Sequence, residues 1–414
     1  MTTSKIKTLV RLAARNLSRN RMRTLVSLLA IGTGCAALII NGGIVADIFR
    51  ELREDAIYGR YGHLQIYRSG YSVNHLRHPE SYLIPDSESR HIVTLSAQCP
   101  HVVGVTRRRE FTGLVSFGGH DVPFVGLGVE PASDKSFSRN LTIREGQGLS
   151  PSSPDGVIAG RGLAEKIGAV PGDSLTLMSL TSSGRFRTTS VQLEGIFEGG
   201  LKEYDDWTLK VPLPAATVLL LDNETEQIVV LVDSTINVHM VKEELQSSFR
   251  RNGLNVEVKT WDQLALFHNQ VVSLFGRELN LITTIVCVVV VLGIGNSISI
   301  SIAERGWEIA CMRAIGLESR QVGEMLVTEA LLTGVVGGLL GVLLGILLAW
   351  SISAIGIPFP SPPGSTRPFL GRVEIIGSTI LLALGLSIAA VVCSSILPIR
   401  RALKYDIAEV LRRG

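Results

Sequence analysis

The sequence predicts an integral membrane α-helical protein with four transmembrane helices in a one-plus-three arrangement and a large α/β extracytoplasmic domain between the first two. Only 19% of its 414 residues are charged, against about 25% in soluble domains. Four stretches contain no charged residue: 24–46, 279–303, 330–366 and 375–399. Each is long enough to cross the bilayer, which takes roughly 20 residues. A soluble enzyme, a secreted disulfide scaffold and a disordered regulator are thereby excluded.

The N-terminal segment, residues 1–23, is basic and precedes the first span. Its cationic residues are Lys5, Lys7, Arg11, Arg15, Arg19, Arg21 and Arg23. Lys and Arg beside a first span hold that end on the cytoplasmic side. The following apolar run is longer than the roughly 7–15 residues of a signal-peptide core. We therefore expect an uncleaved first span at 24–46, with both termini of the chain cytoplasmic.

The segment 47–278 then lies outside the cytoplasm and is expected to fold as an α/β domain. Cys99 is its single cysteine, so an internal disulfide is excluded. Residues 155–160 resemble a strand that ends in a glycine turn, and 162–168 a short helix. Further strands are expected at 174–177, 191–196 and 228–232. The domain has to be stabilised by its own apolar core.

Both ends of this domain carry helical patterns that continue into the neighbouring spans. Residues 47–58 place Ile48, Leu52 and Ala56 four apart. At the other end, Thr260–Gln263 fits a capping box, the side-chain arrangement that satisfies the first free N–H groups of a helix. An apolar stripe follows: Leu264, Phe267, Val271 and Leu274. Two helical stalks are therefore predicted to join the domain to the first and second spans.

The C-terminal half is predicted to contain the other three spans. The predicted segments are the second span 279–303, a cytoplasmic loop 304–329, the third span 330–355, an outer Pro-rich loop 356–374, the fourth span 375–399 and a cytoplasmic tail 400–414. The uncharged run 330–366 exceeds one span, and its four prolines, the first of them Pro358, end the helix. Arg400 and Arg401 in the tail agree with a cytoplasmic location.

Three glycines in the third span, Gly337, Gly341 and Gly345, recur every four residues on one helix face. Small residues at this spacing allow two membrane helices to approach closely. A general enrichment of glycine in membrane helices would give the same pattern. We favour a packing face.

The sequence contains no catalytic signature. Neither a phosphate-binding G-x-x-x-x-G-K-[ST] nor a G-x-S-x-G or H-E-x-x-H motif occurs. His75 and His78, with His63 and His91 nearby, are expected to be surface loop histidines rather than metal ligands. No cofactor and no metal are expected on this chain. The four spans also lack the ionisable residues that mark ion-coupled pathways, so energy for any movement has to come from elsewhere.

The segment 304–316 is expected to form a short amphipathic helix that ends at Gly316. Its apolar strip consists of Trp307, Ile309 and Met312, together with Ile302 just before it. Four charged residues surround the strip: Glu304, Arg305, Glu308 and Arg313. Such a helix either lies on the membrane surface or inserts into a groove of a partner.

Several of these segments resemble the FtsX-like, or MacB-type, permeases of ABC transporters. Residues 303–316 are similar to the family signature E-R-x-x-E-I-x-x-x-R-A-(I/L)-G. Residues 14–21 before the first span and 156–177 in the outer domain also resemble the family. The tail 398–412 looks like its closing P-x-R-R-A-x-x-x-D-P-x-x-x-L-R, with Ile407 in place of the proline. The likeness extends over nearly the whole chain.

This resemblance implies a non-enzymatic permease subunit of a type VII ABC transporter in the bacterial inner membrane. Such permeases dimerise with a second copy or a paralogue, and separate ATPase subunits bind the short inner helix, here Glu304–Gly316. ATP and Mg would be held by those partners. Motion driven from the cytoplasm is passed to the periplasmic domains, which is mechanotransmission. We expect contact with membrane lipid and a periplasmic carrier or adaptor, but not with nucleic acid.

Two functions remain open within this family. The length and residues 62–67 resemble lipoprotein-releasing LolC/LolE-type permeases, which implies a lipid-linked or hydrophobic substrate such as a lipoprotein. The alternative is an FtsX-like signalling permease that regulates a periplasmic cell-wall hydrolase.

Overall fold

The computed structural model describes residues 11, 21–74, 79–181, 184–359 and 369–403. Most of the basic N-terminal cluster, His75 and His78, the prolines from 360 to 363 and the tail motif beyond 403 lie outside this described part. The chain forms two compact units. The helical unit comprises Met1–Phe49, Ser273–Phe359 and Leu370–Gly414, and the sheet unit comprises Arg50–Val272 and Pro360–Phe369.

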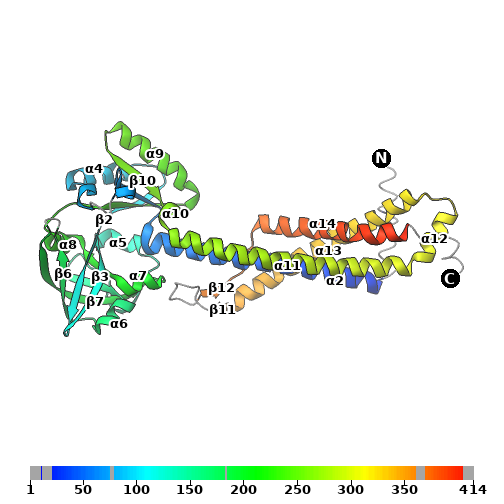
Figure 1. Cartoon of the computed structure of the whole chain (residues 1–414), viewed down its shortest axis with the longest axis horizontal. Coiled ribbons are helices and arrows are strands. Elements are labelled where there is room, and N and C mark those ends of the chain that lie inside the picture. Colours follow the sequence, from blue (N-terminus) through cyan, green and yellow to red (C-terminus); the bar gives the residue numbers. More distant parts are fainter. Residues whose placement is uncertain (1–10, 12–20, 75–78, 182–183, 360–368, 404–414) are drawn as a thin grey trace. The chain divides into compact units, whose positions relative to one another are not determined.

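The helical unit contains long apolar helices that run along one another (Figure 1). They are α2 (Arg21–Ala56), α11 (Leu266–Glu304), α13 (Ser319–Ile355) and α14 (Gly377–Ala402), with the short α12 (Gly306–Ala314) between α11 and α13. Within the described residues, four helices are long and apolar enough to cross a membrane. These four coincide with the four predicted spans.

Two helix boundaries differ from the prediction. α13 begins at Ser319, so residues 319–329 of the predicted cytoplasmic loop are helical and continuous with the third span. α2 continues as predicted through residue 56 and is followed by the π-helix η1 (Ile57–Tyr61). The predicted stripe at Leu264 is interrupted, because α10 (Trp261–Leu264) ends there and α11 starts only at Leu266. At the start of α10, Gln263 Oε1 accepts a hydrogen bond from the Thr260 N–H at 3.3 Å.

The described parts of the outer loop, 356–359 and 369–374, are non-helical. α13 ends at Gly356, which has a left-handed φ of 67°. Two short strands, β11 (Ile357–Phe359) and β12 (Phe369–Gly371), then pair with each other.

The sheet unit contains the predicted α/β domain. Its strands are β1 (Leu64–Arg68), β2 (Val102–Phe117), β3 (His120–Val129), β4 (Thr142–Gly146), β5 (Gly156–Gly160), β6 (Ser174–Leu180), β7 (Phe186–Glu198), β8 (Thr208–Pro212), β9 (Gln227–Val232) and β10 (Val256–Thr260). Its helices are α3 (Tyr71–Asn74), α4 (Asp86–Ala97), α5 (Pro131–Phe137), α6 (Arg161–Ile167), α7 (Lys202–Trp207), α8 (Leu213–Leu220) and α9 (Val238–Arg251), with η2 (Pro79–Tyr82) and η3 (Thr235–Asn237). The predicted strands at 155–160, 174–177, 191–196 and 228–232 and the helix at 162–168 are confirmed.

The long strand β2 belongs to two layers of this unit. Its second half pairs with β3 and β6, and the pairs β3–β8, β8–β5, β5–β7 and β7–β6 close a ring of six strands. Its first half pairs with β9, which continues through β1 to β10. The ring shares one apolar core with α6 and α8. A second core lies under α4 and α9, against β1, β9 and β10.

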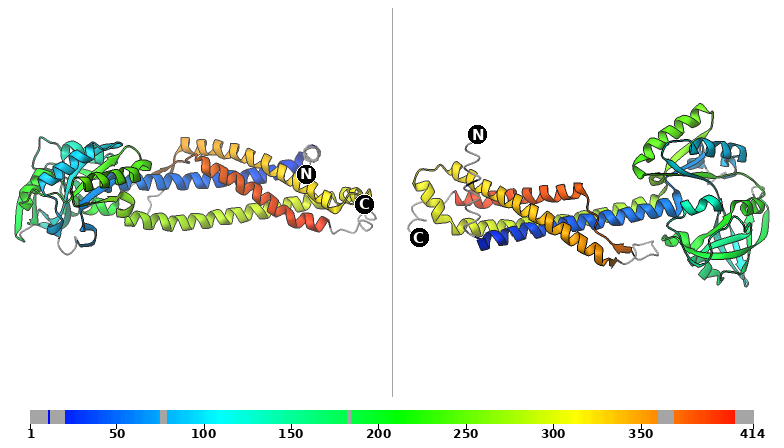
Figure 2. Two further views of the ribbon diagram at one scale, coloured as in Figure 1. Left: turned by 90° about the horizontal axis from the view of Figure 1, so that it is seen from above. Right: turned by 180° about the vertical axis from the view of Figure 1, so that it is seen from behind.

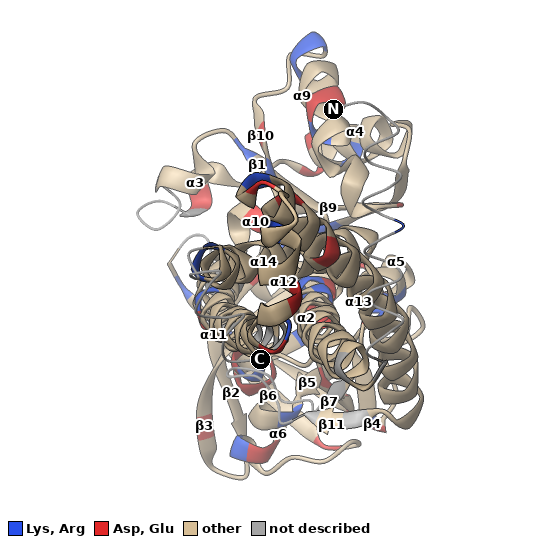
Figure 3. Cartoon of the chain, turned by 90° about the vertical axis from the view of Figure 1, so that its right-hand side faces the viewer, with Lys and Arg blue, Asp and Glu red and all other residues tan. Residues whose placement is uncertain are grey.

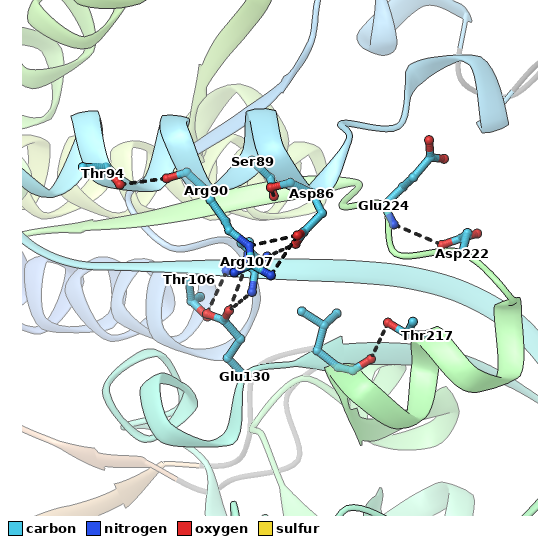
Figure 4. Close-up of polar contacts among 11 residues, drawn as sticks. Asp86, Ser89, Arg90, Thr94, Thr106, Arg107, Glu130, Thr217, Asp222 and Glu224 are labelled. Carbon is cyan, nitrogen blue, oxygen red and sulfur yellow. Dashed lines mark hydrogen bonds and ion pairs between the residues drawn. The ribbon is translucent and has the colours of Figure 1, made fainter.

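Arg107, on the first half of β2, connects these two layers (Figure 4). Its guanidinium donates to Asp86 Oδ1 at the start of α4, at 2.6 Å, and to Glu130 Oε1 at the end of β3, at 2.7 and 2.9 Å. Arg90 donates to the other oxygen of Asp86 at 2.9 Å. Hydrogen bonds from Arg90 and then Arg107 lower the pKa of Asp86, which keeps this carboxyl ionised between its two partners.

A second ionic cluster is completely buried beside the ring. Lys210 of β8 donates to both oxygens of Asp134 in α5, at 2.8 and 3.1 Å, and its side chain is only 1% exposed. Arg108 approaches the same carboxylate at 4.0 Å. Burial opposes ionisation of Asp134, but Lys210 and then Arg108 outweigh it and lower its pKa. One carboxylate therefore compensates two buried cations.

Candidate coupling helix and helix-packing face

The predicted short helix is α12, and glycine ends it. Gly316 has a φ of 105°, a left-handed conformation that favours glycine over any other residue. Its N–H donates to Arg313 O at 3.1 Å, and the Leu317 N–H donates to Met312 O at 3.1 Å. These two bonds form a Schellman motif, which satisfies the last free carbonyls of a helix. Glu318 then precedes α13, and its N–H donates to Gln321 Oε1 at 3.3 Å.

One face of α12 packs into a core shared with the ends of α11, α13 and α14. Ile309 is 2% exposed and Met312 packs at the edge of the same core. The other members come from the three long helices: Ile298, Ile302, Val322, Met325, Leu326, Val327, Ile399, Ala402 and Leu403. The predicted place of Trp307 in this apolar strip is wrong, because its side chain is 54% exposed.

Arg305 fixes the start of α12 to α13. Its guanidinium donates to both oxygens of Glu329, at 2.7 and 2.9 Å, and to Glu308 Oε2 at 3.3 Å. The Arg305 and Glu329 side chains are only 12% and 17% exposed. Opposite charges thus lie next to one another around α12 (Figure 3). Such a charge-assisted, two-point contact restrains orientation as well as distance.

The other face of α12 and the turn after it are exposed. Besides Trp307, Ile315 is 83% and Leu317 is 39% exposed. Glu304 is exposed, while Glu308 and Arg313 are half-buried. An exposed aromatic with two aliphatic side chains and mixed charges suits contact with a partner protein or with the membrane surface. We call Trp307, Ile315 and Leu317 the α12 surface.

The structure places Gly337, Gly341 and Gly345 against α2. A Cβ added at Gly341 would lie 2.6 Å from the Cβ of Cys35 and 2.7 Å from the carbonyl oxygen of Gly32. At Gly337 it would lie 2.9 Å from Ile31, and at Gly345 3.1 Å from Ile39. The backbones of α13 and α2 therefore approach more closely than any larger residue allows.

A second small-residue face of α13 was not identified from the sequence. Gly334 packs against Val391 of α14, and a Cβ at Gly338 would lie 2.7 Å from Leu384 of the same helix. Together with the first face, these glycines give α13 close contacts on two sides (Figure 2). The sequence shows glycines spaced four residues apart. It does not show that Gly337, Gly341 and Gly345 face α2 while Gly334 and Gly338 face α14.

The segment before α14 is attached to α2. Asp47, 2% exposed, accepts a hydrogen bond from the Arg372 N–H at 3.0 Å. The Glu374 N–H donates to Gly43 O at 3.2 Å. A Cβ at Gly43 would lie 2.6 Å from the Glu374 oxygen, so only glycine allows this approach. Asn41 adds a contact between α2 and α11, donating to Thr283 Oγ1 at 3.0 Å.

The prediction that His63 is a surface histidine is wrong. It is 2% exposed, and its Nδ1 accepts a hydrogen bond from the Val232 N–H at 3.2 Å. Burial is the main cause that lowers its pKa to about 4, so the ring is neutral. Among the described residues, no group of three or more His, Cys, Asp or Glu side chains could hold a metal ion.

Four helices long and apolar enough to cross a membrane, with a large α/β unit between the first two, define the class of multi-pass membrane proteins that carry a large domain outside the bilayer. Residues 24–248 match the MacB-like periplasmic core domain, and residues 280–407 match the FtsX-like permease C-terminal region. The chain belongs to the family of FtsX-like permeases with a MacB-like periplasmic core domain. It is a permease subunit of a MacB/FtsX-type ABC transporter, a family whose members are non-catalytic and pair with ABC ATPases.

Two relatives are similar to this chain in sequence. The lipoprotein-releasing system transmembrane protein LolC of Neisseria meningitidis serogroup B is 23% identical over 411 residues, covering 94% of each chain. The pyoverdine export ATP-binding/permease protein PvdT of Pseudomonas fluorescens is 24% identical over 329 residues, 77% of this chain. The chain spans about half of PvdT, 48% of its length.

Two solved structures are also similar in part. The extracellular domain of the noncanonic ABC-type transporter YknZ from Gram-positive bacteria covers 48% of this chain with 13% identity and a TM-score of 0.36. The match covers 99% of that structure. The periplasmic region of MacB from Actinobacillus actinomycetemcomitans covers 50% of this chain, again at 13% identity and a TM-score of 0.36, and the match includes 93% of that structure.

Proposed function

We propose that this permease works by mechanotransmission, driven by separate ATPase subunits that bind the α12 surface in the cytoplasm. Both termini would lie in the cytoplasm and the sheet unit in the periplasm, with the four helices in the inner membrane. ATP and Mg would be bound by the partner ATPase alone. The working unit would be a dimer with a second copy or a paralogue.

The arrangement of α12 is the observation that supports this proposal most. Ile309 and the Arg305–Glu329 ion pair fix α12 to α13, while Trp307 and Ile315 remain available to a partner. A displacement of α12 is therefore passed to α13, and from α13 to α2 through the glycine contacts at Gly337, Gly341 and Gly345. α2 continues without interruption from the helical unit into the sheet unit.

The substrate we propose is a lipid-linked or hydrophobic molecule, such as a lipoprotein, taken from the outer face of the inner membrane. Likeness to LolC over 94% of both chains supports this substrate class. The uncharged spans agree with it, because a lipid-anchored molecule does not need a polar pathway across the bilayer. A periplasmic carrier or adaptor would then receive the substrate.

Co-purification tests the ATPase interaction. The full chain is expressed with the ABC ATPase encoded beside its gene, and the amount of ATPase retained on the tagged permease is measured. Trp307→Glu places a charge on the α12 surface and should reduce retention at least about tenfold, since a buried interface aromatic contributes 2 kcal/mol or more. Met240→Glu, at a side chain 49% exposed on α9, is the matched control. Equal retention by both variants would contradict the proposal.

The orientation is tested by labelling with a membrane-impermeant maleimide. Cys35 and Cys99 are buried, but Cys287 and Cys311 are half-buried and Cys393 is exposed. These three are replaced by serine, and one accessible cysteine is then introduced at Ile236 or Ile315, which are 89% and 83% exposed. We expect Ile236→Cys to react in intact spheroplasts and Ile315→Cys to react only after permeabilisation. The reverse pattern would refute the proposed topology.

The periplasmic partner distinguishes transport from signalling. Cross-linking of the sheet unit in cells is expected to capture a carrier or adaptor protein. Capture of a cell-wall hydrolase would support the FtsX-like regulatory function instead.

A further inference from the structure

The sheet unit encloses a cavity of about 280 Å³. Its walls come from η1, from strands β1, β2, β3, β8 and β9, and from helices α7 and α10. The cavity thus lies where both layers of the unit meet, and it includes no residue of the α12 surface or of the glycine face. Nothing in the permease function proposed above requires it.

Two side chains that line this cavity carry buried hydrogen-bond donors without acceptors. Arg108 is 2% and Tyr204 is 6% exposed. Within the described part of the chain, neither Arg108 Nε nor the Tyr204 hydroxyl has a partner. Another nitrogen of Arg108 donates to the Arg60 carbonyl oxygen at 2.6 Å, which restrains the guanidinium. Burial raises the pKa of Tyr204, so its hydroxyl remains a donor at neutral pH.

Leaving such donors unsatisfied is unfavourable. A buried donor without an acceptor loses the hydrogen bond that it makes to water in the unfolded chain, and native proteins pair nearly all such donors. Two unpaired donors on side chains that line one cavity favour a ligand with an acceptor group there. Arg108 is cationic and Tyr204 is neutral, so the acceptor they suit best is an anionic oxygen.

The same cavity also carries charges that do not pair with each other. Arg60, Glu110 and Glu203 line it, and among the described residues no hydrogen bond or ion pair joins the Arg60 guanidinium to either carboxylate. Burial acts to lower the pKa of Arg60, but Tyr61, Glu110 and Glu203 contribute to raising it. The carboxylates are therefore close enough to influence Arg60 without contacting it. Because the cavity carries a positive charge and negative charges that are apart from each other, it suits a ligand that has one positive and one negative group.

The remaining walls suggest a small ligand with some apolar surface. Val125, Leu127 and Leu264 supply aliphatic side chains, and Tyr61 and Trp207 supply aromatic rings. Sites for drug-sized molecules have volumes of about 300–1,000 Å³, so this cavity lies just below that range. Glu203 and Trp207 are exposed, so the cavity is open to solvent at α7.

We propose that this cavity binds a small zwitterion of the size of an amino acid or a dipeptide. Its acidic group would accept hydrogen bonds from Arg108 and Tyr204 beside Arg60, and its ammonium group would lie near Glu110 and Glu203. Its apolar part would contact Val125 and Leu127. A purely anionic or purely cationic ligand would leave charges of the other sign in the cavity without a counterpart.

Calorimetry on the full chain in lipid nanodiscs, without ATPase, tests this inference. The probe is the dipeptide alanyl-leucine, compared with its N-acetyl derivative, which lacks the ammonium, and its C-terminal amide, which lacks the carboxylate. We expect saturable binding of the dipeptide and at least about tenfold weaker binding of each derivative, because a hydrogen bond to a charged group contributes about 1.5–3 kcal/mol.

Variants of the chain identify the site. Tyr204→Phe removes one hydroxyl and should weaken binding of the dipeptide about tenfold, and Glu203→Gln should weaken the dipeptide but not the N-acetyl derivative. Arg251→Gln, at an exposed arginine of α9, is the matched control and should bind as the wild type does. Thermal unfolding confirms that each variant is folded.

Three results would overturn the inference. One is the absence of saturable heat, which means that the cavity holds only water. Another is equal affinity for the dipeptide and both derivatives. The third is unchanged affinity in folded Tyr204→Phe. Because no ATPase is present, none of these results bears on the proposed transport function, and loss of ATPase retention in Trp307→Glu would not bear on the cavity.

Discussion

Leu64, the first residue of β1, lies directly opposite Thr260, the last residue of β10, in the antiparallel pair of these strands. β1 follows α2 and η1, and β10 precedes α10 and α11. The two long helices that lead into the sheet unit are therefore attached to adjacent strands at the same end of one ladder. The His63 carbonyl reinforces this junction by accepting a hydrogen bond from the Trp261 N–H at 3.1 Å.

Gly341→Ala should destabilise the packing of α13 on α2. The new Cβ would lie 2.6 Å from Cys35 and 2.7 Å from the Gly32 oxygen, and overpacking of this kind costs about 1–3 kcal/mol. The melting temperature of the full chain in detergent measures the loss. Gly385→Ala in α14 is the control, because a Cβ there would meet nothing within 4 Å. Equal melting temperatures for the two variants would mean that the close approach is unimportant for stability.

Arg305→Gln and Glu329→Gln should each lower stability by about 2 kcal/mol, because each removes the shortest ion pair of a poorly exposed charge. The double variant should be less unstable than the sum of the two, and the exchange Arg305→Glu with Glu329→Arg should restore part of the loss. Denaturant unfolding of all four variants measures the coupling. Arg320→Gln breaks an ion pair whose arginine is 85% exposed, so its effect should stay within about 0.5 kcal/mol. Additive single effects would argue against direct coupling.

Asp134→Asn should destabilise the sheet unit more than Lys210→Met does. The first change leaves Lys210 and Arg108 as two buried cations without a carboxylate, whereas the second leaves Asp134 beside Arg108. Removing one partner of a buried ion pair costs about 3–5 kcal/mol, and Asp134→Asn should lie at the upper end. Denaturant titrations followed by tryptophan fluorescence provide the comparison. The opposite order would show that Arg108 contributes little to this cluster.

The stability of the sheet unit should fall as the pH decreases from about 6.5 to about 4. His63 has a folded-state pKa of about 4, and an unfolded histidine has a pKa of about 6.5. Between these values the unfolded chain binds the extra proton, so acidification favours unfolding, by about 3 kcal/mol over the full range. Above about 6.5 this contribution is fully present.

His63→Asn isolates that effect. The asparagine amide oxygen can accept the Val232 bond but does not titrate in this range, so the decrease in stability between pH 6.5 and 4 should become smaller by that amount. His91→Asn, at an exposed histidine of α4, should leave the decrease unchanged. Denaturant unfolding at several pH values measures it. An unchanged decrease in His63→Asn would assign the pH dependence to other groups.

The features that were predicted most accurately are those that depend on a local sequence pattern. The four spans follow from the absence of charge over a bilayer's length, and the end of α12 follows from Gly316, which adopts a conformation unfavourable for other residues. Strand β5 and helix α6 follow from a glycine turn between two short apolar runs. In each case the deciding residues lie within one continuous segment of the sequence.

Features that depend on distant residues were not predictable in this way. Nothing near Arg305 in the sequence indicates that its main partner is Glu329, or that Lys210 pairs with Asp134. Trp307 was placed in the apolar strip because it is apolar, but Ile309 occupies the core with α13 and α14, and Trp307 faces outward. The long strand β2 was missed because its residues 107–110 are charged, and their charges are satisfied by partners such as Asp86, Glu130 and Asp222.

The contact of Gly341 with Gly32 and Cys35 has a mechanical consequence. Side chains between two helices act as soft spacers, since rotamer changes absorb small displacements before the backbones respond. Here main chain meets main chain and no such spacer exists. A displacement of α13 toward α2 at this level therefore moves α2 directly, so the pair is stiff when the two helices are pressed together. Only van der Waals attraction in this contact resists their separation.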